Sequence, residues 1–260
     1  MGDFSVLFEG NALQRLFGGL FVAVRIAMLA LLFSIPLGVL FGLFLSGKNR
    51  VCRLVGRVYL EAVRIMPQLV LLFLVYFGLT RAFGWNLSGE VSAVLVFTFW
   101  GTAELGDLVR SAIVSIPQHQ YLSAAALALS KRQTYLHIIL PQTIRRLVPL
   151  AINLATRMIK TTSLIALIGV VEVLKVGQQI IEGNRYTAPK AAFAIYAVIF
   201  FLYFFACWPL SVFGKYLERK WSYSQNSVSF ENSFRKTVLK ADFSLNLKEA
   251  FSKPEVLKKP

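Results

Sequence analysis

The sequence predicts an all-α integral membrane protein with about five transmembrane helices and additional short cytoplasmic helices. Of its 260 residues, 56% are hydrophobic and 16% are charged. A soluble domain contains about 45–50% apolar and about 25% charged residues, so this composition is typical of a protein in lipid. The mean hydropathy is +0.61, and the 22 Phe residues suit positions beside acyl chains.

Five apolar segments are long enough to cross a bilayer. The clearest is 26–45, which carries no charge and would form about 30 Å of helix, the thickness of a hydrocarbon core. The remaining segments run from about 66 to 83, from about 91 into the 110s, from about 147 to 173, and over 191–213, which is uncharged. Residues 1–220 therefore form the predicted transmembrane domain. The basic segment 221–260 is rich in Ser, Asn and Lys and is expected to be a weakly ordered cytoplasmic tail.

The formal net charge of +15 arises from Lys and Arg residues that lie mainly in loops beside the apolar runs. Cations in such loops are topology signals, and their placement argues against a nucleic-acid-binding face. One side of the predicted spans has Lys48, Arg50, Arg53, Arg57, Arg64, Arg110, Lys131, Arg132, Arg145 and Arg146, and the other has Arg15, Arg81, Lys175, Arg185 and Lys190. Because cytoplasmic loops carry the excess of Lys and Arg, we expect the N-terminus outside and the C-terminus in the cytoplasm.

Two glycine patterns bear on whether the chain binds a nucleotide. Gly42, Gly47 and Lys48 have the spacing of a P-loop, but Asn49 stands where that motif needs Ser or Thr to hold magnesium. The surrounding span also lacks the strand-loop-helix context, so no nucleotide site is predicted. Gly38 and Gly42, four residues apart, instead favour the close approach of another helix.

The sequence contains no recognisable catalytic or metal-binding set. His119 and His137 have no acid or nucleophile at a suitable spacing, and Cys52 and Cys207 lack the spacing of a disulfide framework or a metal site. We therefore predict no catalytic residues, no metal ligands and no cofactor bound by this chain.

The segment 116–146, between the third and fourth spans, is too polar to cross a bilayer but has an apolar stripe at helical spacing. Pro117 suits the first turn of one helix, and Ser130 with Gln133 has the pattern of a capping box that begins a second. We expect two short helices with a bend near residues 129–131. The segment either lies on the membrane as an interfacial helix or docks a partner protein, and docking is the preferred interpretation. The stripe consists of Leu122, Ala125, Ala126, Leu129, Gln133, Leu136 and Leu140.

Two cations fall in the middle of the fourth span. Arg157 and Lys160 each add roughly 2.5–3.5 kcal/mol to insertion there, so both must face the bundle interior or a water-filled route. One interpretation is a buried ion pair with Glu61 or Asp107, and the other is a role on a solute path. Hydroxyl groups able to bond a carboxylate lie beside them, on Thr161, Thr162 and Ser163.

Two carboxylates lie near the cytoplasmic end of the third span. Glu104 and Asp107 share one helix face, and Arg110 lies within one further turn. The acids either pair with Arg110, which is the preferred interpretation, or contact a cationic group. Water can also meet their charge at this depth.

Short motifs along about residues 16–220 keep a fixed order and spacing. Between the third and fourth spans they are Ser115-Ile116-Pro117, Gln120, Ala124, Leu127, Leu129, Ser130, Gln133, Ile138, Leu140, Pro141 and Gln142. Elsewhere they are Tyr59-Leu60-Glu61 with Arg64 and Pro67, Tyr76-Phe77-Gly78-Leu79, Lys160 with Thr162-Ser163-Leu164, Gly169-Val170-Val171-Glu172, Gly177-Gln178-Gln179 and Leu217-Glu218-Arg219. Each is weak alone, but in this order the sequence resembles the polar amino-acid (histidine/glutamine-type) family of ABC importer permeases.

The resemblance implies that residues 116–141 form coupling helices that dock on a separate ATPase subunit. Leu122 stands where the family usually has Glu, so a charge contact is missing, and Ala128 stands where it has Gly, so a stiffer bend is expected. Glu104 also departs from the family, which usually has an aromatic residue there. The residues implied at the ATPase contact are Leu122, Ser123, Ala124, Ala128, Ile138, Leu140 and Pro141.

The implied function is that of a permease subunit in the bacterial inner (plasma) membrane, which moves a polar amino acid by alternating access. The chain alone would not be an enzyme, because ATP and Mg would bind to ATP-binding-cassette ATPase partners. The other implied partners are a second permease subunit, identical or related, a periplasmic or lipid-anchored solute-binding protein, and membrane lipid. Alternatives are a permease for another small polar solute, an exporter, a non-ABC channel and a membrane-embedded enzyme.

Overall fold

The computed structural model describes residues 4–8, 10–47 and 49–252, with side chains described as far as residue 221. The described residues form helices and turns, which confirms the predicted all-α class. The chain divides into two units, Met1–Lys215 and Tyr216–Pro260, and the packing below belongs to the first.

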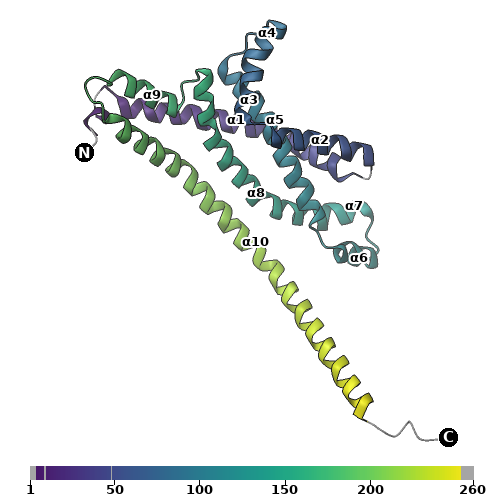
Figure 1. The fold of residues 1–260 in the computed structure, drawn as a ribbon. Helices are drawn as coiled ribbons and strands as arrows, with labels where there is room; N and C mark the ends of the chain where they lie inside the picture. The colour runs from purple at the N-terminus through teal and green to yellow at the C-terminus, as the bar shows by residue number, and fades with distance from the viewer. Residues whose placement is uncertain (1–3, 9, 48, 253–260) are drawn as a thin grey trace, which may run out of the picture. The chain divides into compact units, whose positions relative to one another are not determined.

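The helices follow one another with short connections (Figure 1). In order they are a 3-10 turn Phe4–Leu7, α1 Ala12–Ser46, α2 Arg50–Ile65, α3 Gln68–Phe73, a π-helical turn Leu74–Gly78, α4 Leu79–Phe83, α5 Gly89–Val114, α6 Gln118–Ala126, α7 Lys131–Gln133, a π-helical turn Thr134–Ile139, α8 Leu140–Thr161, a 3-10 segment Thr162–Ile168, α9 Val173–Gly183 and α10 Ala191–Ser252. The last helix continues to Ser252, and the weakly ordered tail expected from residue 221 stays a prediction.

Four segments of the described chain are long and apolar enough to cross a membrane. A fifth candidate is the bent pair Arg50–Ile65 and Gln68–Phe83, whose two parts meet at 98°. The predicted number of about five spans is reached when this pair counts as one. The four straight candidates are Ala12–Ser46, Gly89–Val114, Lys131–Ile168 and Ala191–Trp221.

Proline explains the bend between α2 and α3. Met66 precedes Pro67 and has φ −70° and ψ 127°, the extended backbone that a residue before proline prefers. Pro67 in turn precedes the first turn of α3, where its missing N–H costs no helical hydrogen bond. The sequence-based boundary at residue 66 therefore marks the second half of the bent pair, and the basic helix α2 forms the first.

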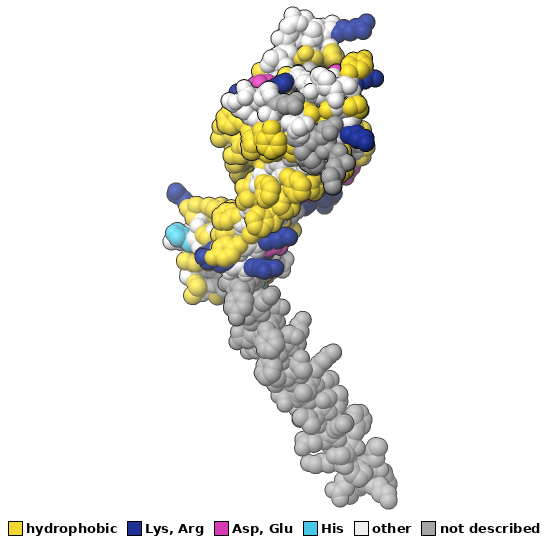
Figure 2. Space-filling view, turned by 90° about the vertical axis from the view of Figure 1, so that its left-hand side faces the viewer, with side chains coloured by type: hydrophobic (Ala, Val, Ile, Leu, Met, Phe, Trp, Pro, Cys, Tyr) yellow, Lys and Arg dark blue, Asp and Glu magenta, His cyan; other side chains and the backbone are white. Residues whose placement is uncertain are grey.

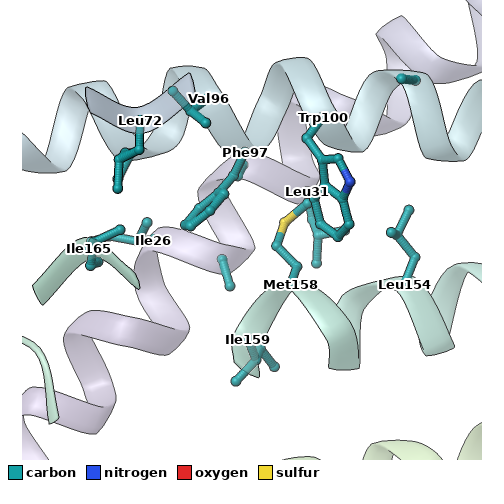
Figure 3. Packing of buried hydrophobic residues seen from close by; sticks show 14 of the residues in the cluster. Ile26, Leu31, Leu72, Val96, Phe97, Trp100, Leu154, Met158, Ile159 and Ile165 are labelled. Carbon is teal, nitrogen blue, oxygen red and sulfur yellow. The ribbon is translucent and has the colours of Figure 1, made fainter. Parts of the chain in front are cut away.

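The core lies between α1, α5 and α8. A Cβ atom added at Gly38 of α1 would lie 2.8 Å from Cβ of Leu105 on α5, and one at Gly42 would lie 2.5 Å from Cβ of Val109. The two glycines therefore permit the close helix contact that their spacing predicts. The side chains of Leu31, Phe97, Trp100, Leu154 and Met158 fill the space between the three helices (Figure 3).

A second apolar cluster joins α9 to the start of α1 and to the first part of α10. Val173, Val176 and Ile180 pack with Ile195 and Ile199.

Outside these clusters, large apolar side chains are exposed along several helices. Figure 2 shows hydrophobic side chains spread between Lys and Arg side chains on one face. Such a surface is stable in contact with lipid rather than water.

Glu172 begins α9 as a buried N-cap. Its Oε1 atom accepts a hydrogen bond of 2.9 Å from the Lys175 backbone N–H, and its Oε2 atom accepts one of 3.0 Å from the Tyr203 hydroxyl of α10. The Glu172 side chain is fully buried. This carboxyl therefore ties α9 to α10 and satisfies an open end of α9.

The segment between α5 and α8 differs from the expectation of two separate short helices. α6 is one short helix, and the predicted capping box is confirmed, because Gln133 N–H donates to Ser130 Oγ and Ser130 N–H donates to Gln133 Oε1. The helix that begins there does not stay separate. It continues through the π-helical turn into α8, so one span candidate covers Lys131–Ile168. No proline or glycine lies between 131 and 140 to break it.

Candidate functional site

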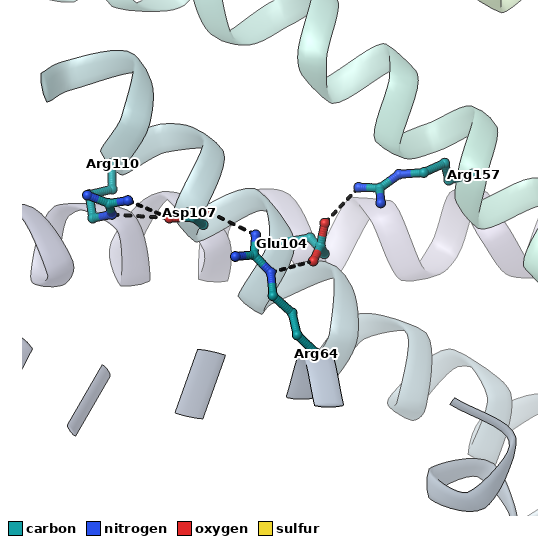
Figure 4. A network of polar contacts seen from close by, with 5 residues as sticks. All are labelled: Arg64, Glu104, Asp107, Arg110 and Arg157. Atoms are coloured by element: carbon teal, nitrogen blue, oxygen red, sulfur yellow. Dashed lines mark hydrogen bonds and ion pairs between the residues drawn. The ribbon is translucent and has the colours of Figure 1, made fainter. Parts of the chain in front are cut away.

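A chain of charged side chains joins three helices at the level of the predicted spans (Figure 4). Glu104 of α5 lies at its centre and is 8% exposed. Its Oε1 atom accepts a 3.0 Å hydrogen bond from Arg64 Nε of α2, and its Oε2 atom accepts a 2.7 Å hydrogen bond from Arg157 Nη2 of α8. Glu104 thus connects α2 to α8.

Asp107 extends this chain by one turn of α5. It accepts a 2.9 Å hydrogen bond from Arg64 Nη2 through Oδ2, and hydrogen bonds of 2.9 and 3.1 Å from Arg110 through Oδ1. The five residues form one network in the order Arg157, Glu104, Arg64, Asp107 and Arg110, and we call it the ion chain. Three guanidinium groups and two carboxylates leave it with one net positive charge.

Arg157, at the α8 end of the ion chain, remains accessible. Arg157 pairs with Glu104 and lies 5.7 Å from the centre of the Trp100 ring, yet 53% of its side chain remains exposed. Lys160, one turn further along α8, is exposed and forms no ion pair with the described residues. Two cations thus share an accessible helix face inside a segment apolar enough to span the membrane.

The pairing partners correct the sequence interpretation at two places. Arg110 pairs with Asp107 alone, while Glu104 pairs with Arg64 and Arg157. Arg157 pairs with Glu104 rather than with Glu61 or Asp107. Glu61 is exposed and has no ion pair in the part of the chain whose side chains are described.

The sequence interpretation counted Arg64 as a topology signal and as part of a motif, but it did not place Arg64 among the candidate site residues. Arg64 belongs to the last turn of α2, immediately before the bend at Pro67. Its two acid partners lie 40 and 43 residues further along the chain. The one signal available from sequence was an arginine among apolar residues next to a span, which predicts a partner but does not identify it.

The hydroxyl groups beside Lys160 donate to the helix itself. Thr161 Oγ1 donates to the Arg157 carbonyl at 2.9 Å, Thr162 Oγ1 to the Ile159 carbonyl at 2.7 Å, and Ser163 Oγ to the Lys160 carbonyl at 3.1 Å. Donation to a bound carboxylate would require these side chains to rotate away from the helix.

The chain changes its helical form at the same place. α8 ends at Thr161 and continues as the 3-10 segment Thr162–Ile168, which stops at Gly169 with φ 85°. This left-handed conformation favours glycine. The 3-10 segment therefore forms the C-terminal end of this span, and α9 begins separately at Val173.

The surface at the other end of α8 carries the residues implied at the ATPase contact. Leu122 of α6 is 69% exposed, and Leu127, which follows α6, is 72% exposed. Ser123, Ala128, Leu140 and Pro141 are also exposed, Ile138 is half-buried, and Ala124 is buried. The exposed members of the implied set, together with the neighbouring Leu127, are called the coupling surface: Leu122, Ser123, Leu127, Ala128, Leu140 and Pro141.

The turn after α6 places Ala128 in a conformation that suits glycine. Ala128 has φ 54°, its N–H donates to the Ala125 carbonyl at 2.9 Å, and the Leu129 N–H donates to the Ala124 carbonyl at 3.1 Å. These two bonds form a Schellman motif with alanine at the left-handed position. Alanine at this position carries a steric cost that glycine avoids, because its Cβ atom disfavours a positive φ.

Contacts with α8 and with the turn before it hold α6 in place. Gln142 Nε2 of α8 donates to Gln120 Oε1 of α6 at 3.2 Å, and Tyr121 of α6 lies edge-on to Tyr135. Arg146 donates to the Ser115 carbonyl at the end of α5. The first two contacts therefore join α6 to α8 and to the π-helical turn before it, and the third joins α8 to α5.

Comparisons with known proteins agree with this arrangement. The L-cystine transport system permease protein TcyB of Bacillus subtilis (strain 168) is 30% identical over 203 residues, which are 78% of this chain and 85% of that protein. The probable glutamine ABC transporter permease protein GlnP of the same organism is 28% identical over 216 residues, 83% of this chain and 98% of that protein.

Solved structures share the fold. The crystal structure of an amino acid ABC transporter with histidines matches with a TM-score of 0.76 at 23% identity, over 85% of this chain and 99% of that chain. An inward-facing structure of the MetNI methionine ABC transporter matches with a TM-score of 0.60 at 14% identity, over 80% and 99% of the two chains. The predicted importer-permease fold is confirmed.

The sequence model of one protein family matches residues 34–223. This range includes the ion chain and the coupling surface. Members of this family are transport components of a membrane rather than enzymes, which agrees with the function expected from the sequence. The chain belongs to the family of binding-protein-dependent transport system inner membrane components.

Proposed function

We propose that this chain imports a polar amino acid as one of two permease subunits, driven by ATPase subunits that dock on the coupling surface. The relatives TcyB and GlnP are named for L-cystine and glutamine transport, which supports the solute class. A solute-binding protein would deliver the solute outside the membrane. The excess of Lys and Arg on the side of α6 supports a cytoplasmic position for that side and for the C-terminus.

The observation that carries the proposed solute path is the exposed cationic face of α8. Arg157 and Lys160 lie on it one turn apart, and the ion chain neutralises Arg157 only in part. An amino-acid carboxylate can bind such a pair with charge-assisted hydrogen bonds. The face would complete a closed path when a second permease subunit covers it.

The ion chain also supports a mechanism of alternating access. In this conformation Glu104 and Asp107 hold Arg64 of α2, while Glu104 alone holds Arg157 of α8. A solute carboxylate that binds Arg157 competes with Glu104 for it. Solute binding would therefore loosen α8 from α5 and leave α2 attached to α5.

The coupling surface would transmit the ATPase movement to these helices. Leu122 and Leu127 offer exposed apolar side chains for a groove on the ATPase. At the position of Leu122, the apolar contact would replace the contact made by the Glu that is usual in the family. The contact of Gln120 with Gln142 would then carry movement of α6 into α8, the helix that holds Arg157.

Uptake of labelled amino acids by the assembled transporter in liposomes tests the proposed solute path. We expect Arg157→Ala and Lys160→Ala each to raise KM by about tenfold or more, because each removes a charge-assisted hydrogen bond. Arg81→Ala, which removes an exposed cation from α4, is the control and should leave uptake unchanged. Unchanged uptake and unchanged solute preference in both α8 variants would rule out this path.

A further inference from the structure

The helix α2 presents a basic face and an apolar face side by side. Arg50, Arg53 and Arg57 follow one another at steps of three and four, so they share one side of the helix. Beside them, the apolar side chains of Val51, Leu54, Val55 and Val58 are between 60% and 67% exposed. The opposite edge, with Gly56 and Leu60, is buried against the protein.

The basic face lines two adjoining hollows. One has a volume of about 230 Å³ and lies between the ends of α1 and α5 and the side of α2. The other has a volume of about 350 Å³ and lies along α2 itself. Arg53 and Arg57 line both. The remaining lining residues are Leu45, Ser46, Arg110 and Val114 for the first and Arg50 and Leu54 for the second.

The electrostatics of these hollows favour an anion. No acidic residue is among those that line them. Arg110 is paired with Asp107, but Arg50, Arg53 and Arg57 form no ion pair with any residue whose side chain is described. Three guanidinium groups that converge without a carboxylate present several donors in the planar arrangement that suits phosphate oxygens.

The position of the hollows along the spans points to a lipid. α1 ends at Ser46 and α5 ends at Val114, and both residues line the first hollow. The 26 residues of α5 form about 39 Å of helix, which reaches from one headgroup layer to the other. The hollow therefore lies at the depth of the headgroups, and the apolar face of α2 lies beside acyl chains.

We propose that Arg50, Arg53 and Arg57 bind the phosphate headgroup of an anionic phospholipid, whose acyl chains lie along Val51, Leu54, Val55 and Val58. A free phosphate ion would use the arginines and leave the apolar face uncovered. A phospholipid satisfies both faces of α2 at once. Basic pockets between spans on one side of a membrane suit this chemistry.

Lipid retention by the full-length chain tests the proposal. The purified protein in detergent is given equal amounts of phosphatidylglycerol and phosphatidylcholine, and native mass spectrometry measures the ratio of the two lipids that stay bound. We expect a preference for phosphatidylglycerol that falls about fivefold for each arginine removed, in Arg57→Gln and in the triple variant Arg50→Gln, Arg53→Gln, Arg57→Gln. The single variant keeps the test valid if the triple variant does not fold.

A matched control removes the same charge elsewhere. Lys215→Gln, Arg219→Gln and Lys220→Gln remove three exposed cations from α10 and should leave the preference unchanged. An equal loss in this control, or no loss in the α2 variants, would overturn the proposal. So would displacement of the lipid by inorganic phosphate at equal concentration, which indicates a soluble anion. Loss of a co-purifying ATPase subunit from the triple variant, with lipid retained, would instead make the face a protein interface.

Discussion

Glu104 and Arg157 are 53 residues apart in the sequence, and their side chains meet at 2.7 Å between α5 and α8. Arg64 occupies the other oxygen of the same carboxylate. A single buried acid therefore holds cations from two different helices. Its removal leaves Arg157 without its ion-pair partner and leaves Arg64 with Asp107 alone.

This relationship predicts coupling between the two residues in a double-mutant cycle. Glu104→Gln and Arg157→Gln should each lower the free energy of unfolding by about 2 kcal/mol, because each breaks a charge-assisted hydrogen bond at a largely buried carboxylate. The double variant should lose about 1 kcal/mol less than the sum. Denaturant unfolding in detergent measures these values.

The pair of Arg25 and Glu90 is the control for that cycle. Its side chains are 43% and 48% exposed, so Glu90→Gln should change the free energy of unfolding by about 0–1 kcal/mol. Strictly additive losses at Glu104 and Arg157 would show that their contact contributes nothing of its own.

The turn after α6 predicts a stabilising substitution. Ala128→Gly should raise the free energy of unfolding by about 1 kcal/mol, because glycine adopts φ 54° without the steric cost that alanine pays. Ala125→Gly, inside α6, should lower it by about 0.5–1 kcal/mol. Thermal unfolding of both variants checks the sign. A loss of stability in Ala128→Gly would contradict the left-handed conformation at this residue.

The coupling surface predicts which apolar side chains hold the ATPase. Leu122→Ala should reduce co-purification of the ATPase subunit about fivefold or more, the effect of removing one interface hot spot. Leu40→Ala, on α1, removes a side chain of similar exposure, 65% against 69%, and should leave co-purification unchanged. Equal retention in the two variants would exclude Leu122 from the contact.

Glu172 predicts a pH dependence of stability. Burial raises the pKa of its carboxyl, and hydrogen bonds from the α9 backbone and Tyr203 oppose the rise only in part. Because the folded pKa exceeds the unfolded value, the protonated form contributes stability at low pH, and this contribution is lost as the pH rises through the folded pKa.

The comparison of wild type with Glu172→Gln isolates this effect. The difference in Tm between the two proteins should become less favourable to wild type as the pH rises above the ordinary glutamate range. Thermal unfolding in a series of buffers measures it. A difference that grows in favour of wild type with rising pH would mean that the carboxyl is stabilised as an anion.

The helices were predictable where charge and length alone decide them. Segments 26–45 and 191–213 have no charge, and both lie within helices of the structure. The bent pair was only half predicted, because Arg50, Arg53 and Arg57 make α2 too basic to resemble a span. The continuity of α7 with α8 was missed, since a capping box shows where a helix begins but not how far it extends.

The sequence indicated most of the residues that form the ion chain, but not which of them pair with each other. The cost of burying Arg157 in a span required a partner, and Glu104 was noted for its unusual position. Which acid meets which arginine depends on how α2, α5 and α8 pack, and residue spacing within one helix does not contain that information. Glu104 and Asp107 are one turn apart, yet only Glu104 reaches α8.

Accessibility of residue 160 tests the central claim that this face of α8 lines a water-filled solute path. Lys160→Cys and the control Leu40→Cys are placed in a chain whose two cysteines are replaced by Cys52→Ser and Cys207→Ala. A charged thiol reagent should label Lys160→Cys in the assembled transporter, the transported amino acid should slow that labelling, and Leu40→Cys should stay unlabelled. Absence of labelling at residue 160, or labelling that no tested amino acid slows, would contradict the account.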